Sequence, residues 1–413
     1  MTRDVSSWFV ERSQSAAAVL INRFTIAGSD YSSRVLSWPS FSRRWNDIRP
    51  RELSINLSNA DGGFNFLRQN PATLTSSCAL ETGFATEGGY LLTEDGDLLL
   101  TEDNLPIEIY LQTEYITLLN GTLRRVSYQD AKATVSMVDK FIGLSNRIVG
   151  TDKVPVDFTG SEHLASDLAW YICTSYGGLD ATKSTDNPDI DYTSFLEWSA
   201  VMSANNIRMS GYYAGEACTQ VLKSIGELTY SAIFDEEGRI KFKRFSVADS
   251  SSNTFEDANL KSMSLAMDLQ RMRNRQYVSG AYDVTSKDFD ITVTYENSGS
   301  VASYGPQEDI LADKRTWLVN SASCIDLAQR MVTVRGEPYN DAQLNTTYYG
   351  LKNSVGDTIT AVDSSAAFSD NFRILGFTIE PNVGTINMEL SQAQLLTGFT
   401  LDTSVLDGPD VLA

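Results

Sequence analysis

Short runs in which apolar and polar residues alternate lie toward both ends of the chain. Every second residue is apolar between positions 51 and 57, and the same alternation returns between positions 385 and 390. A period of two places the apolar side chains on one face of a strand and the polar side chains on the other. The chain therefore has to build sheets with one buried face from both of its end regions.

The apolar spacing changes to three and four positions in the middle of the chain, which is typical of amphipathic helices. We expect helices over 164–172, 193–205 and 218–228, followed by a β-hairpin over 231–245 with its turn at 235–238. The helices and the hairpin together predict an α+β insert between two strand-rich regions.

Other local patterns make further predictions about secondary structure. Alanines near the start favour a helix around 14–21, and a later helix is expected over 321–334. Asn120 and Gly121 form a dipeptide that is typical of hairpin turns, here between the strands of 106–139. The motif Leu-Leu-Thr-Glu-Asp occurs twice within 91–104, where an Asp-Gly pair predicts another tight turn.

The net charge limits the partners that the chain can bind. The chain has 33 basic and 53 acidic residues, which give a net charge of −20. This sign opposes a nucleic-acid-binding surface and binding to an anionic membrane. No stretch reaches the ~18 to 20 apolar residues that span a bilayer, and the apolar run at 16–21 is too short for a signal peptide. We therefore expect a globular protein that is neither exported nor inserted into a membrane.

Few residues are candidates for catalytic or metal-binding chemistry. The chain has four cysteines, Cys78, Cys173, Cys218 and Cys324. Their spacing matches no zinc or redox motif, so we interpret them as buried thiols. The single histidine, His163, is interpreted as an exposed or capping residue at a helix start, with Ser161 as the N-cap. We predict no catalytic residue, no metal site and no cofactor.

Two groups of side chains allow either a functional or a structural interpretation. Asp186, Asp189 and Asp191 can hold calcium, but an Asx turn and a cap for the following helix are favoured. The carboxylates of the 91–104 repeat are likewise interpreted as solvated turns rather than a calcium site. An aromatic set can line a sugar site, but its helical spacing favours core packing. This set is Trp170, Tyr171, Tyr176, Phe195 and Trp198.

Three arginines, Arg271, Arg273 and Arg275, occupy alternate positions. All three lie on one face if the segment is extended. We consider two roles for them, namely ion pairs with acidic partner surfaces, or contacts with solvent and with carboxylates of the same chain. They are the candidate interface residues of the chain.

The order of several segments resembles hub proteins from the baseplate or tail tip of tailed bacteriophages. The similar segments are 24–31 with Trp38 and 51–57, then 119–126 with 135–140, and finally a helix over 322–334 followed by 354–359 and 372–390. The resemblance covers most of residues 24–392.

The resemblance implies a ring-forming homotrimer with two tube-like β domains in each subunit, so that three chains imitate a sixfold tail tube. It implies a structural protein without enzymatic activity. The implied partners are the distal tail protein, the tail tube, the tape measure protein and a central spike or fibre. DNA is implied only as a transient cargo of the lumen, and stable membrane binding is not expected. The implied location is the virion, after synthesis in the cytoplasm of the bacterial host.

The predicted fold class is therefore a β-rich, α+β multidomain chain with two tube-like β-barrel or sandwich domains and an α+β insert. The predicted parts are an N-terminal arm over 1–23, a first β domain over 24–150, the insert over 151–262, a second β domain over 263–395 and a C-terminal tail over 396–413.

Two other interpretations of the function stay open. The chain can be a distal tail or receptor-binding protein of a virion, or a glycan hydrolase, which needs only two carboxylates. For a hub, we hypothesise that acidic side chains line a DNA conduit, because an acidic wall leaves the duplex free to slide. The alternative is that the negative charge only maintains solubility.

Overall fold

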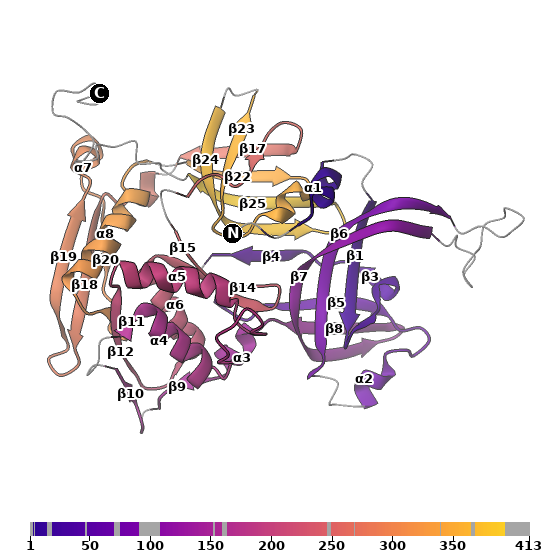
Figure 1. The fold of residues 1–413 in the computed structure, drawn as a ribbon, viewed down its shortest axis with the longest axis horizontal. Coiled ribbons are helices and arrows are strands. Elements are labelled where there is room, and N and C mark those ends of the chain that lie inside the picture. The colour runs from indigo at the N-terminus through magenta and orange to yellow at the C-terminus, as the bar shows by residue number, and fades with distance from the viewer. Residues whose placement is uncertain are drawn as a thin grey trace, which may run out of the picture.

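The computed structural model describes residues 3, 5–14, 19–45, 48–69, 75–90, 108–151, 153–158, 163–245, 249–267, 269–338, 340–364 and 368–392. Two curved sheets occupy the right and the upper middle of Figure 1, and a helical part with a smaller sheet fills the left. The predicted β-rich α+β fold class is confirmed.

The first sheet has seven antiparallel strands in the order β2-β1-β6-β7-β8-β5-β3. Its strands are β1 (Val19–Ile26), β2 (Ser29–Asp30), β3 (Val35–Ser37), β5 (Glu52–Ser58), β6 (Ser77–Tyr90), β7 (Glu108–Gln129) and β8 (Lys132–Val138). The long pair β6 and β7 extends beyond the body of the sheet on the right of Figure 1.

The second sheet is built mainly from the last third of the described chain. Its strands are β16 (Thr254–Phe255), β17 (Leu260–Met267), β22 (Asn340–Thr346), β23 (Thr358–Asp363), β24 (Phe368–Glu380) and β25 (Thr385–Gln392). They follow the order β16-β23-β24-β25-β22-β17, and β4 (Phe41–Arg44) pairs with β24. A strand from the first part of the chain thus joins the second sheet.

The buried faces of the two sheets share one apolar core. Phe24 and Leu80 of the first sheet belong to the same cluster of buried side chains as Phe372 and Ile386 of the second sheet. The short helix α1 (Ser7–Ser13) adds Phe9, whose ring packs edge-on against Phe84 of β6 at 5.0 Å. Because burial of apolar surface is the main favourable contribution to folding, this shared core holds the sheets together.

Most of the remaining elements surround a second apolar core, whereas α2 and the turn Tyr348–Lys352 pack on the first core. The helices are α2 (Asn65–Gln69), beside the first sheet, α3 (Phe141–Ser145), α4 (Ala165–Tyr171), α5 (Tyr192–Ala204), α6 (Cys218–Thr229), α7 (Ser298–Tyr304) and α8 (Ser321–Arg335). The strands are β9 (Ile148–Val149), β10 (Val156–Asp157), β11 (His163–Leu164), β12 (Arg208–Tyr213), β13 (Glu216–Ala217), β14 (Ser231–Glu236), β15 (Arg239–Arg244), β18 (Arg275–Asp283), β19 (Asp288–Glu296), β20 (Glu308–Leu311) and β21 (Thr316–Leu318). Short helical turns lie at Ser32–Arg34, Ile172–Tyr176, Leu269–Arg271 and Tyr348–Lys352.

The small sheet β19-β18-β20 packs with α8 against the insert and not against the second curved sheet. The stretch 263–395, predicted as one β domain, therefore supplies strands to three different sheets, since β21 pairs with β12. The domain boundaries remain predictions.

The expected strands at 51–57 and 385–390 are confirmed, as are the helices near 164–172, 193–205, 218–228 and 321–334. The four cysteines are free and buried, which confirms their interpretation as buried thiols. In the part of the chain that the structure describes, no helix is both long and apolar enough to cross a bilayer. The 91–104 repeat lies outside the described residues.

The helix expected at 14–21 is wrong where the structure describes it. The helix lies earlier, at Ser7–Ser13, and residues 19–21 already belong to β1, which pairs with β6 along its whole length. Backbone pairing with a long neighbouring strand here outweighs the local helix propensity of residues 19–21, which is a weak preference. The alanines at 16–18 lie outside the described residues.

The hairpin turn expected at Asn120 and Gly121 is also wrong. Strand β7 runs through both residues, and the chain reverses between β7 and β8, at Asp130. Gly121 is needed for a different reason: a Cβ atom there would lie 1.9 Å from the carbonyl oxygen of Val138. The glycine allows close approach of two strands.

We expect Gly121→Ala to lower the free energy of unfolding by about 2 to 4 kcal/mol, because the methyl group overlaps backbone atoms that cannot move independently. Gly143→Ala in α3 is the matched control, since a Cβ there meets no atom within 4 Å. Chemical denaturation of both variants measures the difference. Equal stabilities would contradict the role given to Gly121.

Candidate functional site

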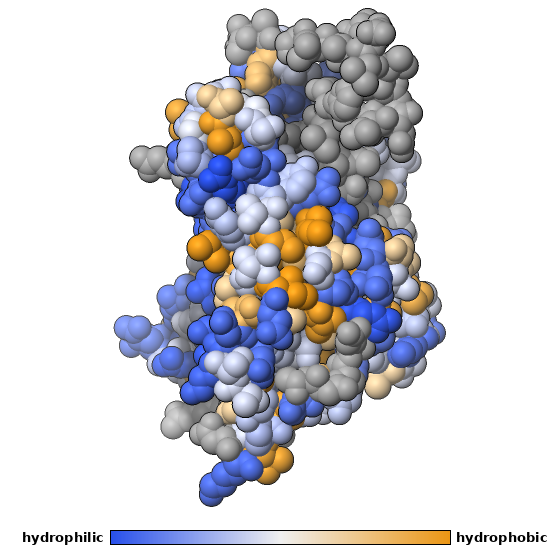
Figure 2. All heavy atoms as spheres, turned by 90° about the vertical axis from the view of Figure 1, so that its left-hand side faces the viewer, coloured by the Kyte–Doolittle hydropathy of each residue, from blue (hydrophilic) through white to orange (hydrophobic). Residues whose placement is uncertain are grey.

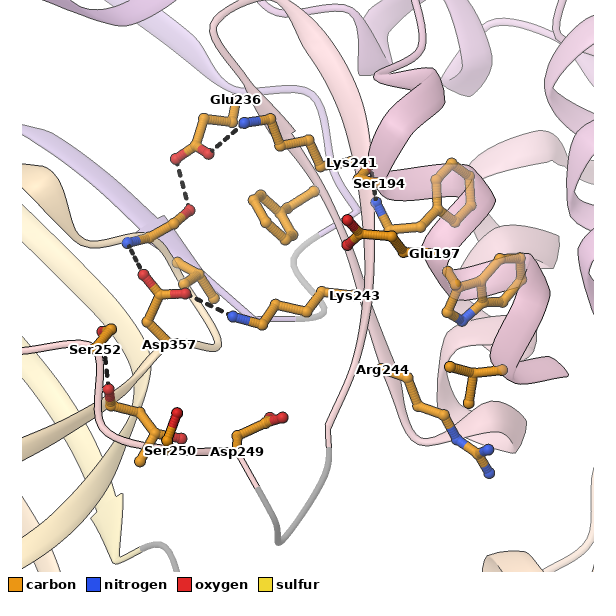
Figure 3. A pocket seen from close by; sticks show the side chains of 17 residues that line it. Ser194, Glu197, Glu236, Lys241, Lys243, Arg244, Asp249, Ser250, Ser252 and Asp357 are labelled. Atoms are coloured by element: carbon orange, nitrogen blue, oxygen red, sulfur yellow. Dashed lines mark hydrogen bonds and ion pairs between the residues drawn. The ribbon is translucent and has the colours of Figure 1, made fainter. Parts of the chain in front are cut away.

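A cavity of about 380 Å³ lies where the insert meets the second sheet. Ser194 and Glu197 of α5 and Lys243 of β15 line one side, and Ser252 and Asp357 line the other. Figure 3 shows Lys243 reaching across this space to Asp357, and their Nζ and Oδ1 atoms are 2.6 Å apart. Contacts between opposite charges therefore close the gap between the two parts of the chain.

Glu236, at the end of β14, is the most highly connected carboxylate of this region. Its Oε1 atom accepts hydrogen bonds from Arg3 Nε at 3.1 Å, Arg43 Nη1 at 2.9 Å and Ser354 Oγ at 2.6 Å. Its Oε2 atom accepts a hydrogen bond from Lys241 Nζ at 2.9 Å. These partners come from the N-terminal arm, β4, the loop before β23 and β15. We call this set the Glu236 junction.

The Glu236 junction is closed to water. Only 1% of the Glu236 surface is exposed, and the side chains of Arg3 and Arg43 are equally buried. Burial alone would raise the pKa of Glu236, but Arg3, Lys241 and Arg43 hold it well below its usual range. Burial lowers the pKa of Arg43 to about 10, which still leaves it cationic at neutral pH. The junction is therefore a buried, fully ionised network.

Two further buried carboxyl groups lie beside the Glu236 junction. Asp139, which follows β8, and Asp235 of β14 are 1% and 0% exposed. Burial and the neighbouring Asp235 carboxylate raise the pKa of Asp139 to about 7, although Arg51 opposes this shift. Burial also raises the pKa of Asp235. The Asp139 carboxyl group therefore binds a proton near neutral pH.

A wider groove of about 750 Å³ separates α6, α8 and β20 from the second sheet. We call it the arginine groove, because five arginines line it: Arg44, Arg271, Arg273, Arg335 and Arg373. Ile310, Leu311, Met331 and Val334 form an apolar part of its wall. Four carboxylates, Glu227, Asp309, Asp341 and Glu389, also line the groove, and Arg271 and Arg44 are paired with Asp341 and Glu389.

The three candidate interface arginines do not share one extended face. Arg271 ends a helical turn rather than lying in an extended segment, and its Nη1 atom is 2.6 Å from Asp341 Oδ2. Arg273 lines the arginine groove together with Arg271. Arg275 begins β18 and pairs with Glu296 and Glu308, each at 2.8 Å. Their role at an interface with another molecule stays a prediction.

The cap expected for the helix after the acidic loop is confirmed. Asp191 is the N-cap of α5, and its Oδ1 atom accepts a hydrogen bond from the backbone of Ser194 at 3.0 Å. Asp189 Oδ1 is 2.6 Å from Lys140 Nζ. Two of the three carboxylates that sequence analysis considered for calcium therefore have structural contacts.

His163 lies in β11, paired with Met209, and its ring packs edge-on against Phe158. The N-cap of α4 is Leu164, so the predicted N-cap Ser161 is wrong; Ser161 itself lies outside the described residues. Core packing of the aromatic set is confirmed for the buried residues Phe195 and Trp198. Tyr171 differs, because 43% of its surface is exposed.

Sequence analysis did not single out Glu236 or Asp139. The turn expected at 235–238 included Glu236, whereas the two turn residues are Glu237 and Gly238, which both have positive φ. One signal was present in the sequence. The run Ser-Ala-Ile-Phe at 231–234 has no charged residue and no polar/apolar alternation, which is typical of a strand buried on both sides.

A tail protein from Neisseria meningitidis has a similar structure, with a TM-score of 0.54 and 12% sequence identity. The alignment covers 90% of this chain and 96% of that chain. The chain has the fold of a tail protein. The fold that the sequence resemblance implied is thereby confirmed.

A 43 kDa tail protein of prophage MuSo2 from Shewanella oneidensis has a TM-score of 0.48 at 12% identity, covering 90% of this chain and 97% of that chain. A prophage tail protein from Listeria monocytogenes has a TM-score of 0.45 at 9% identity, covering 90% and 94% of the two chains. No protein-family model and no curated protein matches the sequence.

Neutralising Glu236 should destabilise the chain strongly. We expect Glu236→Gln to lower the free energy of unfolding by about 3 to 5 kcal/mol, because two arginines and a lysine lose their buried counter-charge. Glu197→Gln, an exposed residue of the same cavity, should change it by less than about 0.5 kcal/mol. Denaturant titration measures the free energy of unfolding of both variants. Similar losses in the two variants would contradict the stabilising role given to the Glu236 junction.

Asp139 should make stability depend on pH. A carboxyl group whose pKa is raised in the folded state stabilises the fold below its unfolded pKa near 4 and loses this contribution as the pH rises through about 7. We expect the stability of Asp139→Asn relative to the natural protein to rise by about 1 to 3 kcal/mol between pH 5 and pH 8. Parallel stability profiles between pH 5 and pH 8 would contradict the raised pKa.

Proposed function

We propose that the chain is a structural hub of a phage tail tip or baseplate, in which three copies form a ring. The ring joins the tail tube to a distal spike or fibre and lets DNA pass. The observation that carries this proposal is the presence of two curved seven-stranded sheets in one chain with a tail-protein fold. Three copies would present six such sheets, which matches the sixfold symmetry of a tail tube.

The edges of both sheets support assembly by strand pairing. In the described part of the chain, β2 and β3 end the first sheet and β16 and β17 end the second, without a partner strand on their outer sides. Strand β17 has eight residues and exposes Leu265. An unpaired edge of this length is a template for a strand of another chain.

Uncharged polar side chains lie on the faces opposite the shared core. On the first sheet, Ser54 pairs with Ser136 at 2.8 Å and Asn56 accepts a hydrogen bond from Thr134 at 2.9 Å. On the second sheet, Gln343, Asn345 and Asn387 line a shallow hollow beside Glu389. Uncharged side chains neutralise no DNA phosphates, so they add little to sequence-independent DNA affinity. The acidic wall hypothesised from the net charge stays a prediction.

The proposed partners are further copies of the chain, the distal tail protein, the tail tube, the tape measure protein and a spike or fibre, and the proposed location is the virion. We infer no enzymatic role. A glycan hydrolase needs two carboxyl groups that contact the substrate, one as acid and one as base or nucleophile. Asp139 and Asp235 are both buried, so a glycan cannot reach them.

The test is a cryo-electron microscopy map of intact tails that contain the chain, together with the mass of the isolated complex. We expect a ring of three copies, three times 45.6 kDa, around a central hole. Leu265→Lys should weaken ring assembly through the edge of β17, and Val284→Lys, at a similarly exposed site outside both curved sheets, should leave it unchanged. A map with another number of copies, or without a hole, would overturn the proposal.

A further inference from the structure

Strand β19 lies at the edge of the small sheet β19-β18-β20. It pairs with β18 on one side, and in the part of the chain that the structure describes no strand pairs with its other side. Figure 1 shows β19 at the left margin of the molecule. Its centre, Ile-Thr-Val-Thr-Tyr at 291–295, consists of residues that favour strands, and β19 contains no proline. The unpaired backbone groups of such an edge are a template for another strand.

The apolar face of β19 is only partly covered. Val293 is paired with Val278 of β18, and both side chains face the second apolar core. Val278 is fully buried, whereas Ile291 and Val293 are only partly buried. The difference arises because β18 has a neighbouring strand on each side and β19 has one neighbour. A strand added beside β19 would bury more of this apolar surface, which is favourable.

Helix α8 contributes apolar surface next to the same edge. It packs over β18 and β19, and its residue Val334 lines the arginine groove on the side of β20. Ile325 is nine positions away from Val334, so it lies on the opposite side of the helix, toward β19. It is 47% exposed. Figure 2 views the molecule from the side on which β19 lies and shows hydrophobic residues gathered in the middle of this face.

The other face of β19 is acidic. Its exposed residues are Asp288, Asp290, Thr292, Thr294 and Glu296. Glu296 is paired with Arg275 of β18, and Lys287 precedes Asp288 in the chain. The face therefore keeps a negative charge around Asp290, which attracts a basic side chain of a partner.

A second copy of the chain does not fit this edge well. If two β19 strands paired antiparallel around Thr292, Asp288 of each copy would lie opposite Glu296 of the other. Like charges directly opposite each other on a sheet are destabilising. The carboxylates therefore oppose self-association of β19 and favour a basic partner segment.

We propose that the free edge of β19 binds an extended segment of another protein in which basic and apolar residues alternate. Backbone hydrogen bonds add this segment to the small sheet as a further strand. Its basic side chains lie on the face of Asp288 and Asp290, and its apolar side chains lie beside Ile291, Val293 and Ile325. This inference does not depend on the proposed ring, because the edge belongs to a single chain.

Binding of synthetic peptides to the full-length chain tests the proposal. The first peptide is a dye-labelled segment in which lysine and valine alternate. The second has the same residues in two blocks, and the third is the first peptide with N-methyl groups on all of its peptide bonds. We expect fluorescence anisotropy to show binding of the first peptide and at least about tenfold weaker binding of the other two, because pattern or backbone hydrogen bonds are lost. No binding of the first peptide, or equal binding of all three, would overturn the proposal.

Hydrogen exchange shows where the first peptide binds. We expect slower amide exchange in residues 288–296 and unchanged exchange in β17, the free edge of the second curved sheet. Slower exchange confined to other parts of the chain would overturn the proposal.

Variants of the edge provide an independent readout. Asp290→Lys and Ile325→Gln should each weaken binding of the first peptide about threefold or more, through the loss of an ionic and an apolar contact respectively. Asp186→Lys, at an exposed carboxylate outside the small sheet, is the matched control and should leave the affinity unchanged. Equal affinities in the three variants would overturn the proposal.

Discussion

The contact on which the arrangement of the chain depends is a carboxylate removed from water. The desolvation of Glu236 is unfavourable, and it is offset only where Arg3, Arg43 and Lys241 approach together. These partners and Ser354 belong to different parts of the fold. Because a buried charge without its counter-charges is very costly, the insert, β4 and the loop before β23 have one favourable relative position.

This ionic contact complements the shared apolar core. The core joins the two curved sheets over a large area, but apolar packing is not directional and does not set the position of the insert. Hydrogen bonds between charged groups are directional and depend strongly on geometry. The core therefore stabilises the pair of sheets, and the Glu236 junction fixes where the insert sits on them. In the hub that we propose, both contributions would keep the binding surfaces at a fixed spacing.

Patterns within a few residues predicted much of the fold, and contacts across the chain explain the rest. The alternation at 51–57, the helical spacing at 218–228 and the cap at Asp191 are local and were predicted correctly. Gly121 was misread because its function depends on Val138, a residue of another strand. Glu236 could not be predicted, since Arg3 and Arg43 are 233 and 193 positions away in the sequence. The order of motifs, in contrast, was sufficient to predict the tail-protein fold.

The most direct test of this account is a distance distribution between the insert and the second sheet. Spin labels at Leu196→Cys of α5 and Asn387→Cys of β25 are exposed, while the four natural thiols are buried. Pulsed electron paramagnetic resonance should give one narrow distribution in this labelled protein and a broad one when Glu236→Gln is added. A distribution that stays equally narrow in the Glu236→Gln protein would contradict the claim that the junction positions the insert.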